Sequence, residues 1–489
     1  MVSSAQVHGA GRPPGTATQP GQLVDGEWIE GAGEPLAVRD KYSLEPFAWI
    51  GTADAAQVRH CVETAHAAFR RGAPGAFERG VVLDRAAALV ETRAEDFVEA
   101  MRREAGFPRQ DALGEVRRCI QTLRLSAEEA RRIAGDIVPV DGAPQQAGRL
   151  AFTLRVPLGV VVAITPFNSP LNTVAHKIAP AFAAGNAAIL KPSPHTPFTA
   201  CLLARALADA GMPRGLLSVL QGGAEVVQRL LQDERVRFIA FTGSTEAGRT
   251  IQQAAGLRRT QMELGSIACT IVCADANLDH ALPRIVGAAY RKAGQVCTSI
   301  QLLLVHRSRM AEVEDRLAGA VRGLAYGDPA DPGTVVGPVI SEASAVRIEA
   351  WIDEAIGRGA RRLAGGRRSG AVIAPTLLAD VDDGMKVSCA EIFGPVMCLL
   401  PFDRLEDAIG RINATPYGLA AGIFTNRLDE ALGAARRLEV GGVHVNDTSS
   451  SRVDMMPYGG SKDSGFGREG PRYAIHEMTE ERVVSFTCV

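Results

Sequence analysis

The stretch ERVRFIAFTGSTEAGRTIQQ, residues 234–253, combines a short apolar run, a glycine-containing turn and a segment with helical spacing. This order predicts a β-strand that leads directly into an α-helix. Backbone amides at a helix N-terminus attract phosphate, and Gly243, Ser244 and Thr245 stand at that junction. The same hydroxyl groups are also common helix caps, and the pattern is not GxGxxG. On this stretch alone, phosphate binding and simple capping both remain open.

Short apolar runs recur along the chain and predict two α/β sheets. A first series occupies residues 159–164, 187–190, 216–220, 237–241 and 269–274, with helix-length segments between the runs. A second series occupies residues 302–306, 372–378, 396–402, 420–426 and 441–446. Runs that are apolar on both faces indicate parallel strands covered by helices on both sides. We therefore expect two α/β domains with a cleft between them.

Three further segments complete the expected organisation. Residues 54–134 have the spacing of two or three amphipathic helices. Residues 136–159 contain two extended apolar pieces around a Gly/Pro turn, which favours a hairpin. Residues 1–20, rich in Gly, Pro, Ser and Thr, are expected to form a flexible tail and not a secretion signal.

Composition narrows the class of protein. The chain has 489 residues, of which 46% are hydrophobic and 22% charged, as expected for a folded protein of several domains. Its net charge of -2 offers no field that would hold nucleic acid or an acidic membrane, and no segment has the roughly 18 apolar residues of a membrane-spanning helix. The nine cysteines are scattered without metal-ligand spacing, so we expect no metal site, no disulfides and a cytoplasmic location.

Three chemically suggestive residues are ambiguous when each is taken alone. Lys191 ends an apolar run, where a lysine is more often solvated than bound to a ribose or phosphate. Cys297, in AGQVCTS, is by itself more typical of a buried thiol than of a nucleophile. Glu263, in QMELGS, is by itself typical of a surface acid.

The combination of motifs is more specific than any single one. The motifs that carry it occur in this order: TPFN (165–168), KPS (191–193), FTGST (241–245), ELG (263–265), GQVC (294–297), EIFGPV (391–396) and PYGGSKDSGFGREG (457–470). Together they resemble the aldehyde dehydrogenase superfamily, from about residue 20 to the C-terminus.

The resemblance implies an α/β subunit of three parts. It assigns residues 21–136 and 158–262 to a Rossmann-like NAD(P)-binding domain and residues 263–465 to an α/β catalytic domain. Residues 137–157 and 466–489 are expected to form a β oligomerisation arm. Because exposed strand edges are normally paired, a homodimer or homotetramer is expected.

The resemblance also implies the roles of individual residues. Cys297 is similar to the nucleophile that forms a thioester, Asn168 to the oxyanion donor, and Glu263 to the base that activates water, which favours hydrolysis to a free acid over transfer to coenzyme A. The residues expected to bind NADP or NAD are Thr165, Pro166, Lys191, Ser193, Pro194, Gly222, Gly243, Ser244, Gly265, Glu391 and Phe393.

The sequence departs from the family pattern at three places. Pro194 stands where members that prefer NAD usually carry a glutamate, which makes use of NADP or of either cofactor an expectation. Ser266 replaces the second glycine of the usual ELGG. The stretch NSPLNTVAHK after Asn168 is polar where many members are apolar.

That polar stretch points to the substrate. The positions expected to line the tunnel are Ser169, Asn172, Thr173 and His176, and the residues expected to bind the substrate are Arg118, Ser169, Asn172, His176, Thr298 and Arg452. If Arg118 and Arg452 face the tunnel, they form a clamp for a phosphonate, phosphate, sulfonate or carboxylate; both are otherwise ordinary surface arginines. We expect oxidation of a small anionic aldehyde. A neutral hydroxyaldehyde such as lactaldehyde, or a catalytically silent member acting as a binding protein, are the alternatives.

Overall fold

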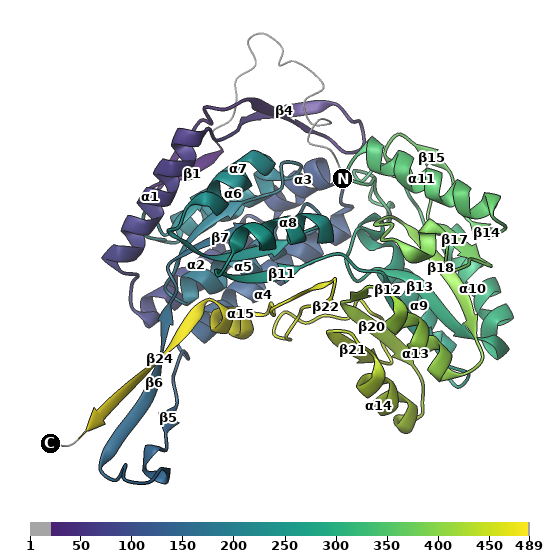
Figure 1. Cartoon of the computed structure of the whole chain (residues 1–489). Coiled ribbons are helices and arrows are strands. Elements are labelled where there is room, and N and C mark those ends of the chain that lie inside the picture. Colours follow the sequence, from purple (N-terminus) through teal and green to yellow (C-terminus); the bar gives the residue numbers. More distant parts are fainter. Residues whose placement is uncertain (1–20, 488–489) are drawn as a thin grey trace.

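The structure is a computed structural model that describes residues 21–487. The expected tail at residues 1–20 and the last two residues of the expected arm lie outside the described residues. Two α/β lobes lie side by side, and a narrow β hairpin projects from the first lobe (Figure 1).

The first lobe is built on an eight-stranded sheet in the order β2-β1-β9-β8-β7-β10-β11-β23. Its five central strands are parallel and almost completely buried, as the doubly apolar runs predict. The strands are β1 (Gln22–Val24), β2 (Glu27–Ile29), β7 (Val160–Ile164), β8 (Ala187–Lys191), β9 (Leu217–Val219), β10 (Val236–Thr242), β11 (Arg259–Glu263) and β23 (Gly465–Phe466).

Helices cover both faces of this sheet and share one hydrophobic core with it. Residues 54–134 form four helices, one more than the spacing suggests, because only Arg93 separates the second helix from the third. The helices are α1 (Ala55–Arg71), α2 (Ala76–Thr92), α3 (Ala94–Ala105), α4 (Arg109–Ala130), α5 (Asn172–Ala183), α6 (Pro197–Asp209), α7 (Ala224–Gln232), α8 (Thr245–Ala255) and α15 (Pro471–Glu477).

The second lobe has its own core and a seven-stranded sheet in the order β14-β17-β18-β13-β12-β20-β21. The run at residues 269–274, expected in the first sheet, forms β12 in the second one, where it pairs with β13 and β20. The strands are β12 (Ala268–Val272), β13 (Ile300–His306), β14 (Arg361–Ala364), β17 (Thr376–Ala379), β18 (Val396–Phe402), β20 (Ala420–Phe424) and β21 (Gly442–Val445). The helices are α9 (Leu278–Tyr290), α10 (Met310–Arg322), α11 (Glu342–Gly357), α12 (Lys386–Cys389), α13 (Leu405–Ala414) and α14 (Leu428–Arg437).

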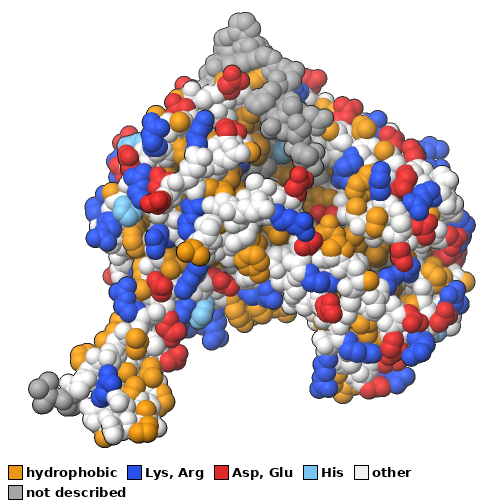
Figure 2. Space-filling view, viewed as in Figure 1, with side chains coloured by type: hydrophobic (Ala, Val, Ile, Leu, Met, Phe, Trp, Pro, Cys, Tyr) orange, Lys and Arg blue, Asp and Glu red, His pale blue; other side chains and the backbone are white. Residues whose placement is uncertain are grey.

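The projecting sheet contains β5 (Ile137–Val138), β6 (Arg149–Pro157) and β24 (Thr479–Thr487), in the order β24-β6-β5. Apolar side chains gather on its surface (Figure 2), among them those of Ile137, Leu150, Val483 and Phe486. Residues 466–478, expected in this arm, instead belong to the first lobe, because α15 packs on α4 and α5. Of residues 466–487, only those of β24 belong to the projecting sheet.

Small two-stranded sheets complete the fold: β3 (Pro35–Arg39) with β4 (Pro46–Gly51), β15 (Arg368–Ser369) with β16 (Val372–Ile373), and β19 (Tyr417–Gly418) with β22 (Ser461–Lys462). Among the described residues, none of the helices combines the length and the apolar character that crossing a membrane requires.

Candidate active site

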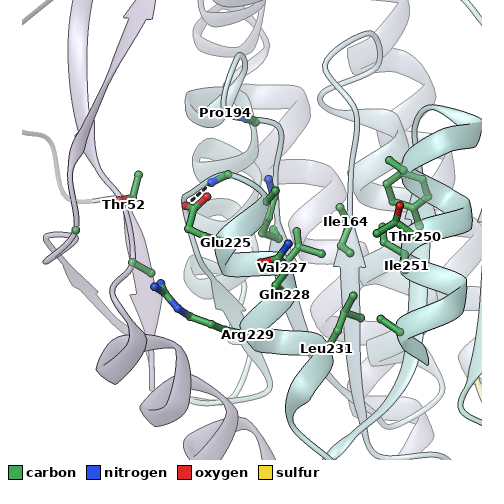
Figure 3. Close-up of a pocket in the computed structure, with 18 of the residues that line it drawn as sticks. Thr52, Ile164, Pro194, Glu225, Val227, Gln228, Arg229, Leu231, Thr250 and Ile251 are labelled. Atoms are coloured by element: carbon green, nitrogen blue, oxygen red, sulfur yellow. Dashed lines mark hydrogen bonds between the residues drawn. The ribbon is translucent and has the colours of Figure 1, made fainter. Parts of the chain in front are cut away.

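A cavity of about 1240 Å³ opens where the parallel strands of the first lobe end (Figure 3). Ile164, Lys191 and Phe241 lie at or near the carboxyl ends of β7, β8 and β10, and all three line it. The carboxyl end of a parallel sheet is the usual place for a ligand in an α/β fold. Ser244 also lines the cavity and caps α8 by accepting a hydrogen bond from the backbone N–H of Ala247 at 3.3 Å.

Lys191 is the buried cation of this cavity. Its Nζ donates to the carbonyl oxygen of Gly222 at 2.9 Å, and burial lowers its pKa to about 8 although Glu225 opposes the shift. Pro194 lines the same cavity, and the Glu225 carboxylate accepts from the backbone N–H of Gly223 at 2.8 Å (Figure 3). The lining of this cavity therefore includes the Glu225 carboxylate, although Pro194 supplies none.

Two of the remaining residues expected to bind cofactor line a smaller pocket. Glu391 and Phe393 line the smaller pocket, where burial raises the pKa of Glu391 to about 7 and its carboxylate accepts from the backbone N–H of Ser266 at 2.9 Å. Aromatic contacts of Phe167 with His195 and with Phe393 link the two pockets. The other six residues of the set line neither pocket: Thr165, Pro166, Ser193, Gly222, Gly243 and Gly265. The backbone N–H groups of Thr165 and Gly243 donate to Lys191 and Glu263, which end β8 and β11.

Cys297 follows a turn with unusual backbone geometry. Lys292 and Ala293 have φ values of 51° and 53°, in the left-handed region that side chains other than glycine rarely adopt. The turn presents the Cys297 thiol 2.8 Å from the hydroxyl oxygen of Tyr458. Burial raises the pKa of this thiol to about 11, against the lowering effect of the Tyr458 hydrogen bond.

Glu263 lies at the end of β11 and is buried, with one carboxyl oxygen that has no partner within the described part of the chain. Burial, and then the charge of Glu469, raise its pKa well above the usual value. Burial also opposes ionisation of Glu469, but Lys177 at 3.0 Å and Arg452 outweigh it and lower the pKa to about 2. Glu263 thus holds its proton more tightly than the neighbouring Glu469 does.

Asn168 lies between β7 and α5, and its backbone carbonyl accepts a hydrogen bond from Nζ of Lys292 at 3.1 Å. The same ammonium group forms a buried ion pair with Glu115 at 2.7 Å. Glu115 in turn accepts from the hydroxyl of Ser169 at 2.8 Å. One ion pair therefore connects the segment that carries Asn168 with the turn that carries Cys297.

The polar residues expected to line the tunnel are largely satisfied by one another. Asp454 accepts from Arg118 at 2.7 Å and from the side chain of Asn172 at 3.0 Å, and it lies 2.9 Å from Nε2 of His176. Asn172 and His176 are almost fully buried, because their face of α5 packs on α4. They are therefore not the open hydrogen-bonding groups that the sequence predicts.

The expected clamp of two free arginines is not formed either. Arg118 is paired with Asp454, and Arg452 donates to Glu469 at 3.0 Å while its guanidinium group lies 3.8 Å from the centre of the Tyr458 ring. Each guanidinium group is already neutralised by a carboxylate, although Nε of Arg452 is buried and lacks a partner among the described residues.

A third arginine, which the sequence analysis does not identify, lies closer to the thiol in the chain. Arg291 donates to the hydroxyl of Ser450 at 2.7 Å, and Ser450 lies 3.1 Å from the hydroxyl of Thr298, the neighbour of Cys297. Within residues 21–487, Arg291 forms no ion pair, and burial lowers its pKa. A half-buried, unneutralised guanidinium group beside two hydroxyl groups suits an oxyanion.

Comparisons with known proteins agree with this geometry. The chain matches the aldehyde dehydrogenase family over residues 28–484. It is 45% identical, over 467 residues, to a protein named 3-sulfolactaldehyde dehydrogenase from Priestia aryabhattai, which covers 95% of this chain and 98% of that protein.

Two solved structures are also similar. Aldehyde dehydrogenase 21 from Physcomitrella patens, in complex with the reaction product succinate, has a TM-score of 0.94 and 37% identity over 96% of this chain and 99% of that one. The NADP-dependent glyceraldehyde-3-phosphate dehydrogenase from Bacillus halodurans C-125, complexed with NADP, has a TM-score of 0.93 and 34% identity over 96% of this chain and 100% of that one. The chain belongs to the aldehyde dehydrogenase family.

Membership confirms the α/β aldehyde dehydrogenase fold that the ordered motifs predict. It also confirms the expected enzyme class, an NAD(P)-dependent oxidoreductase that acts on an aldehyde group.

Proposed function

We propose that this enzyme oxidises a small aldehyde that ends in a sulfonate, carboxylate, phosphonate or phosphate, and releases the carboxylic acid. The observation that carries the proposal is Arg291, which is half-buried, has no carboxylate partner among the described residues and is hydrogen-bonded to Ser450. An oxyanion held there gains a charge-assisted pair in a partly desolvated site. The name of the sulfolactaldehyde relative and the succinate in the complex of aldehyde dehydrogenase 21 are consistent with such an anion.

In the proposed reaction, Cys297 is the nucleophile. Its sulfur attacks the aldehyde carbon, and the carbonyl oxygen takes the negative charge. The side-chain amide of Asn168 donates to that oxygen, which is worth about 3 to 4 kcal/mol in comparable sites. The Lys292 ammonium group donates to the backbone carbonyl of Asn168 and so holds the backbone that carries this amide.

The oxyanion re-forms the carbonyl bond as hydride leaves the aldehyde carbon, and the product is a thioester on Cys297. Glu263 then acts as the base for its hydrolysis. Its carboxyl group must be ionised for this role, and the positive charges of Arg452, Lys177 and Arg468 favour the ionised form although burial and Glu469 oppose it. The ionised carboxylate takes a proton from water as the water attacks the thioester carbonyl, and the carbon–sulfur bond breaks. Gly459 leaves room for this side chain, since a Cβ there would lie 2.9 Å from its oxygen.

The cavity of the first lobe fits NADP or NAD. Its N-terminal end of α8 suits a pyrophosphate, its buried Lys191 suits a ribose or phosphate, and Glu391 lies in the adjoining pocket. When bound, the dinucleotide accepts the hydride from the aldehyde carbon. We also propose that Thr165, Pro166, Ser193, Pro194, Gly222, Gly243, Gly265 and Phe393 contribute to binding of the dinucleotide.

We also propose that the enzyme is a homodimer or homotetramer. The projecting sheet exposes apolar side chains, including those of Ile137 and Val483 at exposures of 73% and 66%. They support this assembly because such a surface is usually covered by another subunit.

A panel of aldehydes tests the function. Short aldehydes of two to four carbons with a terminal sulfonate, carboxylate, phosphonate or phosphate are compared with propanal and hexanal, using both cofactors. We expect kcat/KM to be at least tenfold higher for one charged class than for propanal. A preference for hexanal, or for neutral lactaldehyde over all charged substrates, would overturn the proposal.

A further inference from the structure

Tyr458 belongs to the motif PYGGSKDSGFGREG but has no role in the reaction described so far. Its hydroxyl oxygen lies 2.8 Å from the sulfur of Cys297, and no other side chain among the described residues forms a hydrogen bond with that sulfur. The contact joins residues 161 positions apart in the chain, so it is a product of the fold.

The Tyr458 ring is held in place from two directions. Its backbone forms a pair of hydrogen bonds with Glu469, at 3.1 and 2.6 Å. The guanidinium group of Arg452 lies 3.8 Å from the centre of its ring, as in a cation–π contact. Its hydroxyl group is therefore aimed at the sulfur by a rigid support.

The direction of the hydrogen bond follows from the surroundings. Burial, and then the nearby Cys297 and Glu263, raise the pKa of the Tyr458 phenol well above its usual value, so the phenol keeps its proton. A thiol is a weak donor, whereas a thiolate is a strong acceptor. The Tyr458 O–H group thus donates to sulfur, and the bond strengthens as the sulfur becomes charged.

We propose that Tyr458 is a catalytic residue that donates a hydrogen bond to the sulfur of Cys297, stabilises its thiolate and orients it for attack. This inference rests on the proposed role of Cys297 as the nucleophile. No proton leaves the phenol; the thiol proton passes to a separate base, and the hydrogen bond weakens once the sulfur lone pair forms the bond to the aldehyde carbon.

Other charged groups also face the sulfur and have to be kept constant in a test. They are Glu263 from β11, Glu391 from the loop after α12, Arg452 from the segment after β21, and Arg291 from the turn before Cys297. Tyr458→Phe retains the ring beneath Arg452 and removes only the hydroxyl group, so none of these four side chains is altered.

The test is the rate at which iodoacetamide alkylates Cys297 in the full-length enzyme without cofactor, between pH 6 and 10. Trypsin should release the Cys297 peptide as residues 293–307, which mass spectrometry separates from the peptide of the exposed Cys389. Tyr458→Phe should slow alkylation of Cys297 about tenfold at pH 8 and move its pH profile upward. The Cys389 rate should not change, and Tyr326→Phe, which alters an exposed tyrosine, should leave both rates unchanged.

An unchanged or faster Cys297 rate in Tyr458→Phe would overturn the inference. The same experiment separates this failure from a failure of the proposed function. If wild-type enzyme in which Cys297 is fully alkylated retains full dehydrogenase activity, Cys297 is not the nucleophile, whatever the effect of Tyr458.

Discussion

At the scale of single residues, the site contains two buried carboxyl groups, Glu263 and Glu469, whose pKa values are shifted in opposite directions. Glu263 is buried and has a raised pKa, whereas Glu469 stays ionised because Lys177 and Arg452 lie against it. A base with a raised pKa is ionised to a greater extent as the pH rises. Hydrolysis of the thioester should therefore become faster as the pH rises.

Glu263→Gln tests this role. The amide cannot take a proton from water, so a stoichiometric burst of reduced cofactor should precede turnover that is slower by at least about a hundredfold. Stopped-flow absorbance at the nicotinamide band measures both phases. The slow phase of the variant should lose the pH dependence of the wild type, and equal loss of burst and steady state would place Glu263 before the thioester instead.

The sequence predicts these residues unevenly. Cys297, Glu263 and Asn168 stand out in the sequence because each belongs to a motif. Arg291 lies six positions before Cys297 but belongs to none of these motifs. The sequence does not reveal its contact with Ser450, because Ser450 is 159 residues away. The predicted clamp of Arg118 and Arg452 fails for the same reason, because a sequence does not show that Asp454 and Glu469 neutralise them.

At the scale of elements, the buried ion pair of Lys292 and Glu115 connects α4 with the turn before Cys297. Both side chains are almost wholly buried, at 8% and 1% exposure. Removing one partner leaves an uncompensated charge inside the protein. The pair therefore stabilises the backbone of a turn whose φ values are unfavourable.

Lys292→Met should lower the free energy of unfolding by about 3 to 5 kcal/mol, measured by urea denaturation. It should also lower kcat, because Asn168 loses its support. The double variant Lys292→Met with Glu115→Gln should recover part of the stability, since the unpaired charge is gone. A single variant as stable as the wild type would show that the pair contributes nothing to this turn.

Elements are predictable where their periodicity is unbroken. The apolar runs mark the strands of both sheets, but they do not show which sheet each strand joins, and β12 was expected in the wrong one. Pairing partners depend on contacts across the whole chain. The single-residue break at Arg93 is equally hard to predict, because helical spacing continues through it.

At the scale of the whole molecule, the cofactor cavity in the first lobe determines which dinucleotide is accepted. Pro194 lines it and supplies no carboxylate, while the Glu225 carboxylate on the same cavity is bonded to the backbone of Gly223. We expect NADP to be used at least as well as NAD.

Pro194→Glu should shift the preference. A second carboxylate there would repel a 2′-phosphate, so the ratio of kcat/KM for NADP to that for NAD should fall by about tenfold or more. Steady-state kinetics with both cofactors and one aldehyde measure this ratio. If the ratio does not change, Pro194 does not face the ribose.

The account depends most on the claim that Arg291 binds the anionic end of the substrate. The most direct measurement is kcat/KM for a charged aldehyde and for propanal, in wild-type enzyme and in Arg291→Leu. Arg307→Leu, which removes an exposed arginine at 61% exposure, is the matched control. We predict that Arg291→Leu lowers kcat/KM for the charged aldehyde about tenfold or more and for propanal less than threefold, whereas the control changes neither. Equal losses for both substrates would contradict the account.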